Sequence, residues 1–578
     1  MTSPDSPIWV YPTPDPKLSA QITKEFNIHP VTAQILISRG FRSTEQIHEF
    51  LYAKLPNLLD PDLFPEMDKA VDRVLKALQL KEPILIYGDN DVDGMTAAAL
   101  LTEFLQAVGG QVFFDLPNRA SLRKSMIGDA LETAIKHHCK LLITVDCGIS
   151  AAKEIEEVVQ KGIDVIVTDH HEPTSTIPHC VATLNPKLIN STYPNRDLTG
   201  VGVAFKLAHG VLNALSEMPH MTPPKIDLKN YLDLVALGTI ADMGALTGEN
   251  RILVRYGLKQ LKKMKRVGLA KLFQLSDLIP SEINPVTIAS KIAPRLNSLG
   301  RIDEPIKGVE LLLIRDNAGA ETLAKELDLN NLARQKIERE ATEDIEKILN
   351  KHPETLQQKA IVLTSSKWHP GVIPIISARI AKQYNRPSLI ISVDQGIGKG
   401  SIRTIPEFPL LPVLKSNQNL LINFGGHDFA AGLTIQEANI PVFQRKFIEA
   451  ATKVLQDRDL NPKMHLDAPI KFEELTFDFL ESLSLLEPFG NENPSPLLYS
   501  EVMQIWPPKL VGKQHLKLFL EQGNRTIEGM AFGLAARKDE LKQRNLHIRI
   551  AFTPQINLFL NKASIQLLIK DFQVLQRK

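Results

Sequence analysis

The chain has 578 residues, of which 43% are hydrophobic and 23% charged, and its formal net charge is +1. This length favours three to four domains, and the composition is that of an ordinary globular protein rather than a disordered or fibrous one. No apolar run reaches the ~18 residues that a membrane span needs. The opening stretch, MTSPDSPIWVYPTPDP, lacks the basic and apolar regions of a secretion signal.

Cysteine usage and charge distribution narrow the class further. Cys139, Cys147 and Cys180 are too few and too scattered for a disulfide framework or a CxxC zinc site, so we expect a reducing, cytoplasmic setting. The charge is uneven, because residues 501–578 carry 13 Lys and Arg against 6 Asp and Glu, a local net charge of +7. Such a segment can bind a phosphate backbone, or it can be an ordinary solvated surface.

The first half of the chain predicts an α/β domain. Residues 1–80 are helical and punctuated by proline, and we expect them to pack on the domain that follows. From residue 81 to about 315, short apolar runs alternate with helical segments, which is typical of a parallel sheet covered by helices on both faces. The expected strands are Ile84–Tyr87, Val112–Leu116, Leu141–Val145 and Ile163–Val167.

The second half predicts a connecting helix and two smaller domains. Residues 316–352 contain a long charged amphipathic stretch, Glu321–Asn350, without Gly or Pro, as expected of a helix that joins two domains. A second, smaller α/β domain follows over residues 353–458. The short strand-like runs HLKLFLEQ, LHIRIAFTP and ASIQLLIKDF in residues 459–578 indicate a small β-barrel or sandwich.

Acidic and imidazole side chains follow the apolar runs of the first domain. Because the carboxyl ends of parallel strands meet at one edge of a sheet, where ligands bind, we expect these groups to line one crevice. We expect all four motifs that carry them at strand ends. They are Asp89, Asp91 and Asp93 in GDNDVDG, Asp146 in VDCG, Asp169-His170-His171 in TDHH, and Asp242 in ADMG.

A crevice with this many carboxylates needs cations, because like charges repel and raise each other's pKa. Carboxylate and imidazole ligands without thiolates favour Mn²⁺ or Mg²⁺ over structural zinc. An EF-hand loop does not fit GDNDVDG, since no Glu stands at the twelfth position and a strand precedes the motif. Helix N-capping explains any single Asp, but four such motifs in succession indicate a metal centre.

In this order, the four motifs resemble those of the DHH phosphoesterase superfamily. Longer stretches are similar to its RecJ single-strand exonuclease family, and the resemblance runs from about Asp89 to the C-terminus. It implies a DHH domain, a connecting helix, a DHHA1 domain and a C-terminal OB-fold. It also implies a nuclease of DNA repair and recombination that removes 5′-mononucleotides from the 5′ end of single-stranded DNA. The stretches include LTGVGVAFKLA (198–208), IAPRLNSLGRIDEP (292–305), WHPGVIPIISARI (368–380) and FGGHDFAAGLTI (424–435).

The resemblance implies a centre of two divalent cations, Mn²⁺ or Mg²⁺. Asp146 is expected to bridge them, and Asp89 to complete or hydrogen-bond the first. Asp169 is expected to orient the imidazole ligand that follows it, and His171 to donate to an oxygen of the scissile phosphate. The expected ligands are Asp91, Asp93, Asp146, His170 and Asp242.

The resemblance also implies residues that bind phosphate and the DNA strand. Each of these arginines could instead form a surface or interdomain salt bridge, and the glycine pair could be only a tight turn. The expected partners are single-stranded DNA, a single-strand binding protein and a RecQ-type helicase, with the chain a monomer. The residues implied to bind phosphate and the DNA strand are Arg119, Arg295, Asn297 and Arg301; Ser401, Arg403, Gly425, Gly426 and His427; and Lys513, His515 and Lys517, of which the last three are expected on one strand face.

Two stretches depart from the family pattern. PNRASLRKSMIG, which begins at Pro117, lacks the Gly–Tyr–Gly run that usually follows PNR. PFGNENPSP (488–496) stands in place of PFGxGNPEP, with Asn491 and Glu492 displacing the second glycine.

Other functions stay open on the sequence alone. A short DHH phosphodiesterase acting on oligonucleotides or cyclic dinucleotides generally lacks an OB-fold, so the basic C-terminal segment argues against it. A non-catalytic DNA-binding scaffold of the same superfamily would have lost ligand positions, and all are present here. A manganese pyrophosphatase would need no domain that guides DNA.

Overall fold

The computed structural model describes residues 7–117, 127–218, 225–302, 304–559 and 562–575. The chain divides into two compact units. The first comprises Tyr52–Arg334 with Glu487–Pro494, and the second comprises Met1–Leu51, Gln335–Leu486 and Ser495–Lys578. Within the described ranges, no helix combines the length and the apolar character that a membrane crossing needs.

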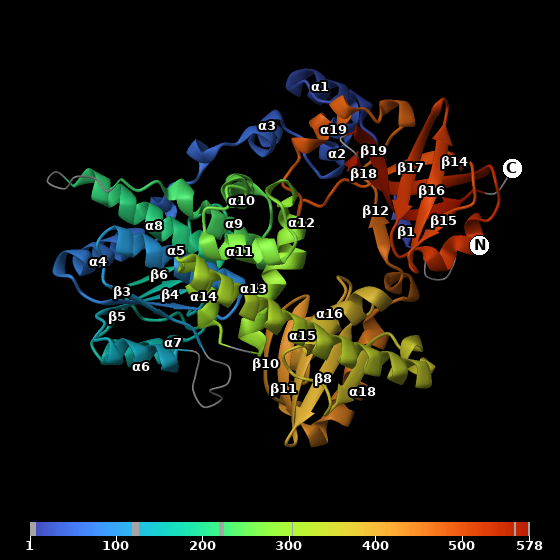
Figure 1. The fold of residues 1–578 in the computed structure, drawn as a ribbon. Helices are drawn as coiled ribbons and strands as arrows, with labels where there is room; N and C mark the ends of the chain where they lie inside the picture. Colours follow the sequence, from blue (N-terminus) through green and yellow to red (C-terminus); the bar gives the residue numbers. More distant parts are fainter. Residues whose placement is uncertain (1–6, 118–126, 219–224, 303, 560–561, 576–578) are drawn as a thin grey trace. The chain divides into compact units, whose positions relative to one another are not determined.

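The first unit is built on a five-stranded, all-parallel sheet, as expected (Figure 1). Its strand order is β3 (Val112–Asp115), β2 (Ile84–Gly88), β4 (Leu141–Val145), β5 (Asp164–Thr168) and β6 (Ala182–Leu184). The sequence patterns predicted four of these strands and missed the three-residue β6. Helices α6 (Gly128–Lys136) and α7 (Ala152–Gln160) cover one face, and α5 (Val92–Ala107), α8 (Gly200–Glu217) and α9 (Leu232–Ala241) lie on the other.

Helices bury both faces of the sheet, and alternate strand residues point to opposite faces. Ile84 and Ile86 of β2 join the core that contains α5 and α8, whereas Leu85 and Tyr87 join the core that contains α6 and α7. This explains why the strands are apolar throughout instead of alternating with polar residues.

The strand order places the ligand crevice. From β2 the chain moves outward to β3, and then returns to β4 on the opposite side of β2. At such a reversal the connections leave the carboxyl ends of the two strands in opposite directions and open a crevice between them. Asp89, Asp91 and Asp93 follow β2, and Asp146 follows β4.

Asp242 was expected at a strand end, and this was wrong. It follows α9, whose residues are apolar on all sides and almost all buried. A short apolar run can form a buried strand or a buried helix, and periodicity alone does not separate the two.

Further helices complete the first unit and lead out of it. The long connecting helix was predicted over residues 316–352, and the structure confirms it as α15, a continuous helix of 35 residues. The helices that complete the first unit and lead out of it are α4 (Met67–Leu80), α10 (Gly248–Leu261), α11 (Val267–Leu275), α12 (Pro285–Thr287), α13 (Ala293–Ile302), α14 (Ile306–Leu313) and α15 (Asn317–Lys351).

The second unit contains a mixed five-stranded sheet in the order β10–β11–β9–β8–β7. Only β7 and β8 are parallel, and α16 (Ile373–Tyr384) and α18 (Ile440–Val454) pack against the sheet. The strands are β7 (Ile361–Ser365), β8 (Ser388–Asp394), β9 (Ile397–Arg403), β10 (Leu421–His427) and β11 (Ala430–Gln436).

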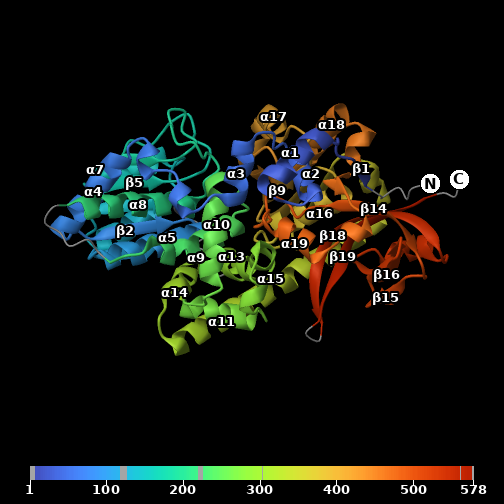
Figure 2. The same ribbon diagram turned by 90° about the horizontal axis from the view of Figure 1, so that it is seen from above.

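The C-terminal domain is a closed five-stranded barrel, as the OB-fold expectation required. Pairing between β14 and β16 closes the ring β14–β18–β19–β17–β16, and the short β15 (Lys509–Val511) extends from β16. Figure 2 shows β18 and β19 running side by side. The barrel strands are β14 (Leu498–Gln504), β16 (His515–Gln522), β17 (Arg525–Ala531), β18 (Leu546–Phe559) and β19 (Lys562–Val574).

The N-terminal segment is divided between the two units. We expected residues 1–80 to pack on the catalytic domain; the residues from Tyr52 on belong to the first unit with that domain, whereas the residues before Tyr52 belong to the second unit. β1 (Ile8–Val10) pairs in parallel with β12 (Lys463–His465), and Trp9 Nε1 donates a hydrogen bond to Asp571 Oδ2 at 2.6 Å. Arg39, which follows α2 (Pro30–Ser38), pairs with Asp467 at 3.1 Å. Such non-local pairings leave no local signature in the sequence.

Candidate active site

Three aspartates follow β2 at the junction with α5, and helix N-termini hold two of them. Asp91 caps the helix, since its Oδ1 accepts hydrogen bonds from the backbone N–H groups of Asp93 (2.9 Å) and Gly94 (3.1 Å). Asp93 is buried and reaches the N-terminus of α8, where its carboxylate accepts from the N–H groups of Gly200 (2.7 Å) and Val201 (3.0 Å). A helix N-terminus favours an anion, so α8 holds this carboxylate in place.

Asp146, which follows β4, is the most constrained residue of the site. It is only 1% exposed, and its backbone has a φ of +60°, a conformation that costs a non-glycine residue energy and that clusters at functional sites. A Cβ at Gly200 would lie 2.5 Å from Asp146 Oδ1, so only glycine fits beside the carboxylate. Among the described residues, no donor hydrogen-bonds to either carboxylate oxygen.

The TDHH motif follows β5, and both carboxylate oxygens of its Asp169 accept hydrogen bonds. Asp169 Oδ1 accepts from the N–H groups of His170 (2.7 Å) and His171 (3.0 Å) and pairs with His171 Nδ1 at 2.8 Å, and Oδ2 accepts from Ile149 N at 2.9 Å. Asp169 was expected to orient the ring of His170, but in the structure it holds the ring of His171. Asp169 therefore positions the motif and leaves His170 to face the carboxylates.

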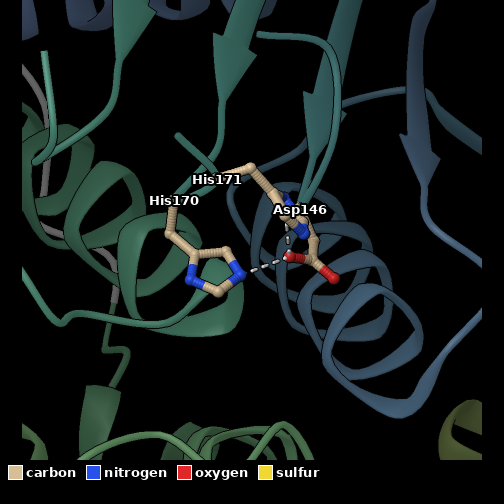
Figure 3. Close-up of side chains that lie close together, drawn as sticks. All are labelled: Asp146, His170 and His171. Carbon is tan, nitrogen blue, oxygen red and sulfur yellow. Dashed lines mark ion pairs between the residues drawn. The ribbon is translucent and has the colours of Figure 1, made fainter. Parts of the chain in front are cut away.

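His170 lies at the centre of the acidic cluster. Its Nε2 is 3.0 Å from Asp146 Oδ1, 3.7 Å from Asp242 Oδ2 and 3.9 Å from Asp93 Oδ2. Figure 3 shows the rings of His170 and His171 converging on Asp146. The residues predicted as metal ligands thus come together from the ends of β2, β4, β5 and α9.

The site contains three groups whose ligand atoms all lie within 4.8 Å of one another. Asp146 belongs to two of them, which is what a carboxylate shared between two cations requires. The groups are Asp89, Asp91 and Asp146; Asp93, His170 and Asp242; and Asp146, His170 and His171.

Burial sets the electrostatics of these groups. Burial, followed by the charges of neighbouring aspartates, raises the pKa of Asp93 and Asp146 well above the usual range. Burial and then the charge of Asp91 raise the pKa of Asp242 to about 7, against the opposing charges of His171 and Lys187.

The Asp169–His171 pair shifts in the opposite direction. Burial opposes both charges, but the hydrogen bond and ion pair between them raise the pKa of His171 to about 9 and lower that of Asp169.

These observations fit divalent cations. Asp146 presents two buried carboxylate oxygens to which no described donor hydrogen-bonds, and buried carboxylates of raised pKa crowd around it. Oxygen ligands with one or two imidazoles and no thiolate suit Mn²⁺ or Mg²⁺. The residues present therefore match the expected cofactor.

The other residues expected from the first domain are less clearly placed. Arg119 lies outside the described residues, and Arg301 lies on α13, where its side chain is not described. Arg295 pairs with Asp328 at 2.8 Å, and the Oδ1 of Asn297 accepts from Val92 N at 3.1 Å, next to the metal ligands. Asn297 thus braces the start of α5.

The residues expected in the second unit share one sheet. Register pairs Ser401 with Gly432 and then Gly425, and it pairs Arg403 with Ala430 and then His427. Because adjacent strands are about 4.8 Å apart, Arg403 and His427 lie roughly 10 Å apart along one row. Arg403 is half-buried, Gly425, Gly426 and His427 are exposed, and burial lowers the pKa of Arg403.

On the barrel, one of the three expected residues is displaced. Lys513 was expected on the same strand face as His515 and Lys517, but it lies in the turn before β16, so this was wrong. His515 packs edge-on against Phe532 at 4.9 Å, and Lys517 pairs with Glu528 at 2.8 Å. Trp506, stacked under Arg544 at 4.0 Å, and Phe532 are both exposed, whereas Phe552 is core.

Sequence reasoning assigned no role to several residues that build the site. Asn185 is buried, and its Nδ2 donates to the carbonyl of His171 at 2.9 Å, which fixes the TDHH loop. Lys187 lines a cavity of about 400 Å³ with His170, Asp242 and Glu492. Glu492 stands where the family pattern has glycine and keeps a left-handed backbone, with φ of +56°. The sequence hinted at only two of these features of the site: the glycines of LTGVG, of which Gly200 lies against Asp146, and the departure from the family pattern at Glu492.

Comparison with known proteins agrees with this architecture. The model of the DHH family, N-terminal domain, matches residues 83–239, that of the DHHA1 domain matches residues 357–453, and that of the RecJ OB domain matches residues 466–571. These three domains in this order define a DHH-family protein that carries an added OB domain.

Curated relatives specify the family. A single-stranded-DNA-specific exonuclease RecJ of Bacillus subtilis (strain 168) is 34% identical over 573 residues, covering 98% of this chain and 71% of the relative. That of Haemophilus influenzae is 33% identical over 558 residues, covering 94% and 96%. The chain belongs to the RecJ family.

Solved structures show the same fold. The crystal structure of RecJ in complex with Mn²⁺ from Thermus thermophilus matches 99% of this chain and 80% of its own, with a TM-score of 0.82 and 29% identity. The Mg²⁺ complex of RecJ from the same organism matches with a TM-score of 0.75 and 26% identity.

Proposed function

We propose that the chain is a single-stranded-DNA-specific exonuclease that releases 5′-mononucleotides from the 5′ end, in DNA repair and recombination. The observation that carries the proposal is the convergence of the four motifs on buried Asp146, in a chain whose relatives are named RecJ exonucleases. The expected reaction is hydrolysis of phosphodiester bonds.

The ligand set would hold two divalent cations, with Asp146 shared between them. Asp89 and Asp91, grouped with Asp146, would hold one cation, and Asp93, His170 and Asp242 would hold the other. When bound, such cations offset the carboxylate charges, polarise a phosphoryl oxygen and make a water more acidic.

The chain's own groups orient the reaction. His171 Nδ1 is engaged by Asp169 at 2.8 Å, so in the protonated ring Nε2–H is the donor available to an oxygen of the scissile phosphate. The peptide N–H groups at the start of α8 hold Asp93, and Asn185 holds the carbonyl of His171. These contacts fix the ligands before substrate arrives, which is how a site favours a transition state.

The second unit supplies surfaces suited to a single strand. Arg403 and the exposed segment Gly425–His427 offer donors for a phosphate, and the buried Ser401 accepts a hydrogen bond from Arg403 Nη1 at 3.3 Å and so supports that arginine. The barrel offers exposed Trp506 and Phe532 beside Arg544 and His515, an arrangement typical of base stacking on OB-folds. We assign the surface around Arg403 and His427 to binding a 5′ phosphate, and the aromatic surface of the barrel to binding the rest of the strand.

Two other functions fit these features less well. A non-catalytic scaffold has no use for strained Asp146 and a complete ligand set. A short phosphodiesterase of oligonucleotides or cyclic dinucleotides has no use for the closed C-terminal barrel. A single-strand binding protein and a RecQ-type helicase as partners, a monomeric state and a cytoplasmic location stay predictions.

The test uses single strands labelled at the 5′ or the 3′ end, incubated with Mn²⁺, Mg²⁺ or EDTA. We expect cation-dependent release of 5′-labelled mononucleotides at the earliest times, and no hydrolysis in EDTA. Duplexes should resist. Hydrolysis that persists in EDTA, or early loss of the 3′ label instead of the 5′ label, would contradict the proposal.

A further inference from the structure

A second cavity opens beside the metal ligands. It has a volume of about 480 Å³ and shares Met243, Gly244 and Asn491 with the 400 Å³ cavity that His170 and Asp242 line. The two cavities are therefore neighbours joined along the segment that follows Asp242. The apolar lining of the larger one comprises Ile240, Met243, Leu246, Val286, Ala289 and Phe489.

Apolar side chains are unusually exposed at this place. Met243, the residue after the ligand Asp242, is 60% exposed, and Val286, which also lines the cavity, is 63% exposed. Apolar side chains that stay exposed beside carboxylates do not stabilise the fold by burial. A group of exposed apolar side chains around a cavity therefore marks a binding site. Met243 also has a φ of +60°, so its backbone is strained where its side chain enters the cavity.

The wall of the cavity is held firmly. Asn491 Nδ2 donates to the carbonyl of Met243 at 2.7 Å, and Leu246 N donates to the carbonyl of Asn491 at 2.9 Å. Gly490 N donates to Asn493 O at 2.8 Å, which closes the turn that carries Phe489 and Asn491. The cavity is thus built before a ligand arrives.

We propose that this cavity binds a nucleobase of the strand whose phosphate lies at the metal ligands. The proposal rests on the proposed function. A planar base has one face for Phe489 and another for a flexible methionine, and a methionine side chain adapts to rings of different size. The cavity beside His170 and Asp242 would hold the phosphate, and the apolar cavity would hold the base. The sugar that connects them would lie where the two cavities share Met243 and Asn491.

The cavity would accept any of the four bases, because it binds the flat ring and not its hydrogen-bonding groups. The donor groups of its polar side chains are already engaged, since Ser290 Oγ donates to the carbonyl of Val286 at 2.6 Å and the Asn491 amide donates to the carbonyl of Met243 at 2.7 Å. Stacking without hydrogen-bond readout tolerates every base. A degradative exonuclease needs this property at each step along a strand.

The first experiment replaces single nucleotides near the 5′ end by abasic tetrahydrofuran residues, one position at a time. At one position the abasic strand should be hydrolysed about tenfold more slowly than the natural strand, the size expected for one lost stacking contact. Val286→Ala and Met243→Ala should reduce that natural-to-abasic ratio towards one. Leu80→Ala, at an apolar residue 58% exposed on α4 of the same unit, should keep it.

The second experiment does not depend on hydrolysis. Strands with 5-iodouracil at the same position are bound in EDTA and photocrosslinked, and we expect crosslinked peptides that contain Met243 or Phe489. Equal rates on natural and abasic strands at all positions, or a ratio unchanged in both variants, would overturn the proposal. Crosslinks only to other segments, or none while the strand is bound, would do the same. Crosslinks at Phe489 without hydrolysis of any strand would instead refute the proposed function.

Discussion

Gly200 and Asp146 are in such close contact that position 200 has no room for a side chain, because a Cβ there would lie 2.5 Å from Asp146 Oδ1. The same glycine donates its N–H to Asp93 at 2.7 Å. Gly200→Ala should therefore displace two ligands at once and lower cation-dependent hydrolysis by about 10–100-fold, as expected for disturbed support of metal ligands. Activity and Mn²⁺ binding by calorimetry measure this.

The matched control for that change is Gly210→Ala on the same helix. A Cβ at Gly210 would meet Met67 Sδ and Val71 Cγ2, both at 3.2 Å and away from the ligands, instead of the 2.5 Å found at Gly200. This variant should keep its activity and Mn²⁺ affinity. Equal losses in the two variants would show that α8 tolerates no added methyl group anywhere, and the contact with Asp146 would then have no special role.

A second prediction concerns pH in the metal-free protein. Buried carboxylates with raised pKa stabilise the fold below their unfolded pKa of about 4, and this contribution is lost as pH rises through the folded pKa. For Asp242 that window runs from about 4 to about 7. In EDTA, the melting temperature should fall as pH rises from 5 to 8, and Mn²⁺ should restore it because cations bind the ionised form.

Asp146→Asn is the variant that checks this electrostatic argument. It removes a buried charge with little change of shape, so in EDTA at pH 8 it should melt above the wild type, by about 2–4 °C for each kcal/mol gained. It should also be inactive and gain less stability from Mn²⁺. Near-normal hydrolysis by this folded variant would contradict a shared ligand at position 146.

Local patterns in the sequence predicted the parts of the fold that local burial dictates. β2, β4 and β5 are apolar because helices cover both faces of their sheet, so their ends, and with them Asp89 to Asp93, Asp146 and His170, were visible in the sequence. The charged α15 was predicted to within a residue at each end.

Residues brought in from elsewhere in the chain could not be predicted. Asn185 and Lys187 reach the site only because β6 joins the sheet, and a three-residue strand carries almost no periodic signal. Asp242 was recognised through its motif, although the helix before it was taken for a strand. Glu492 enters the site because residues 487–494 belong to the first unit, a non-local arrangement.

A third prediction concerns a buried ion pair in the first unit. Lys206 and Glu249 are almost fully buried and pair at 2.5 Å, and Glu249 also accepts from the hydroxyl of Tyr193. Lys206→Met should lower the free energy of unfolding by about 3–5 kcal/mol, since it leaves a buried carboxylate without its cation. Lys69→Met, at the exposed pair with Glu66, should leave the unfolding curve unchanged. Equal stability of both variants would refute the argument.

A fourth prediction concerns the aromatic surface of the barrel. Trp506→Ala and Phe532→Ala should each weaken binding of long single strands by about tenfold, the effect of one stacked base. Phe477→Ala, at an exposed phenylalanine on α19 (Phe477–Ser484), should not. Fluorescence anisotropy measures this in EDTA. Affinities that match in all three variants would exclude the barrel aromatics from the DNA path.

A fifth prediction concerns the 5′ phosphate. Arg403→Ala should slow hydrolysis of 5′-phosphorylated strands by about tenfold or more, the loss of a charge-assisted hydrogen bond. Hydrolysis of bis-p-nitrophenyl phosphate, which has no terminal phosphate, should fall much less. Lys446→Ala, at an exposed lysine on α18, serves as the control. An equal effect on both substrates would mean that Arg403 acts on the fold and not on the strand end.

The hydrogen bond between Trp9 and Asp571 joins two residues that are made far apart in time. They are 562 residues apart along the chain. At ribosomal rates of about 5–20 residues per second, roughly 30–110 s separate the synthesis of Trp9 from that of Asp571. The segment that carries β1 therefore completes its fold only after β19 has been made, and a change next to β1 acts on the folding of the barrel.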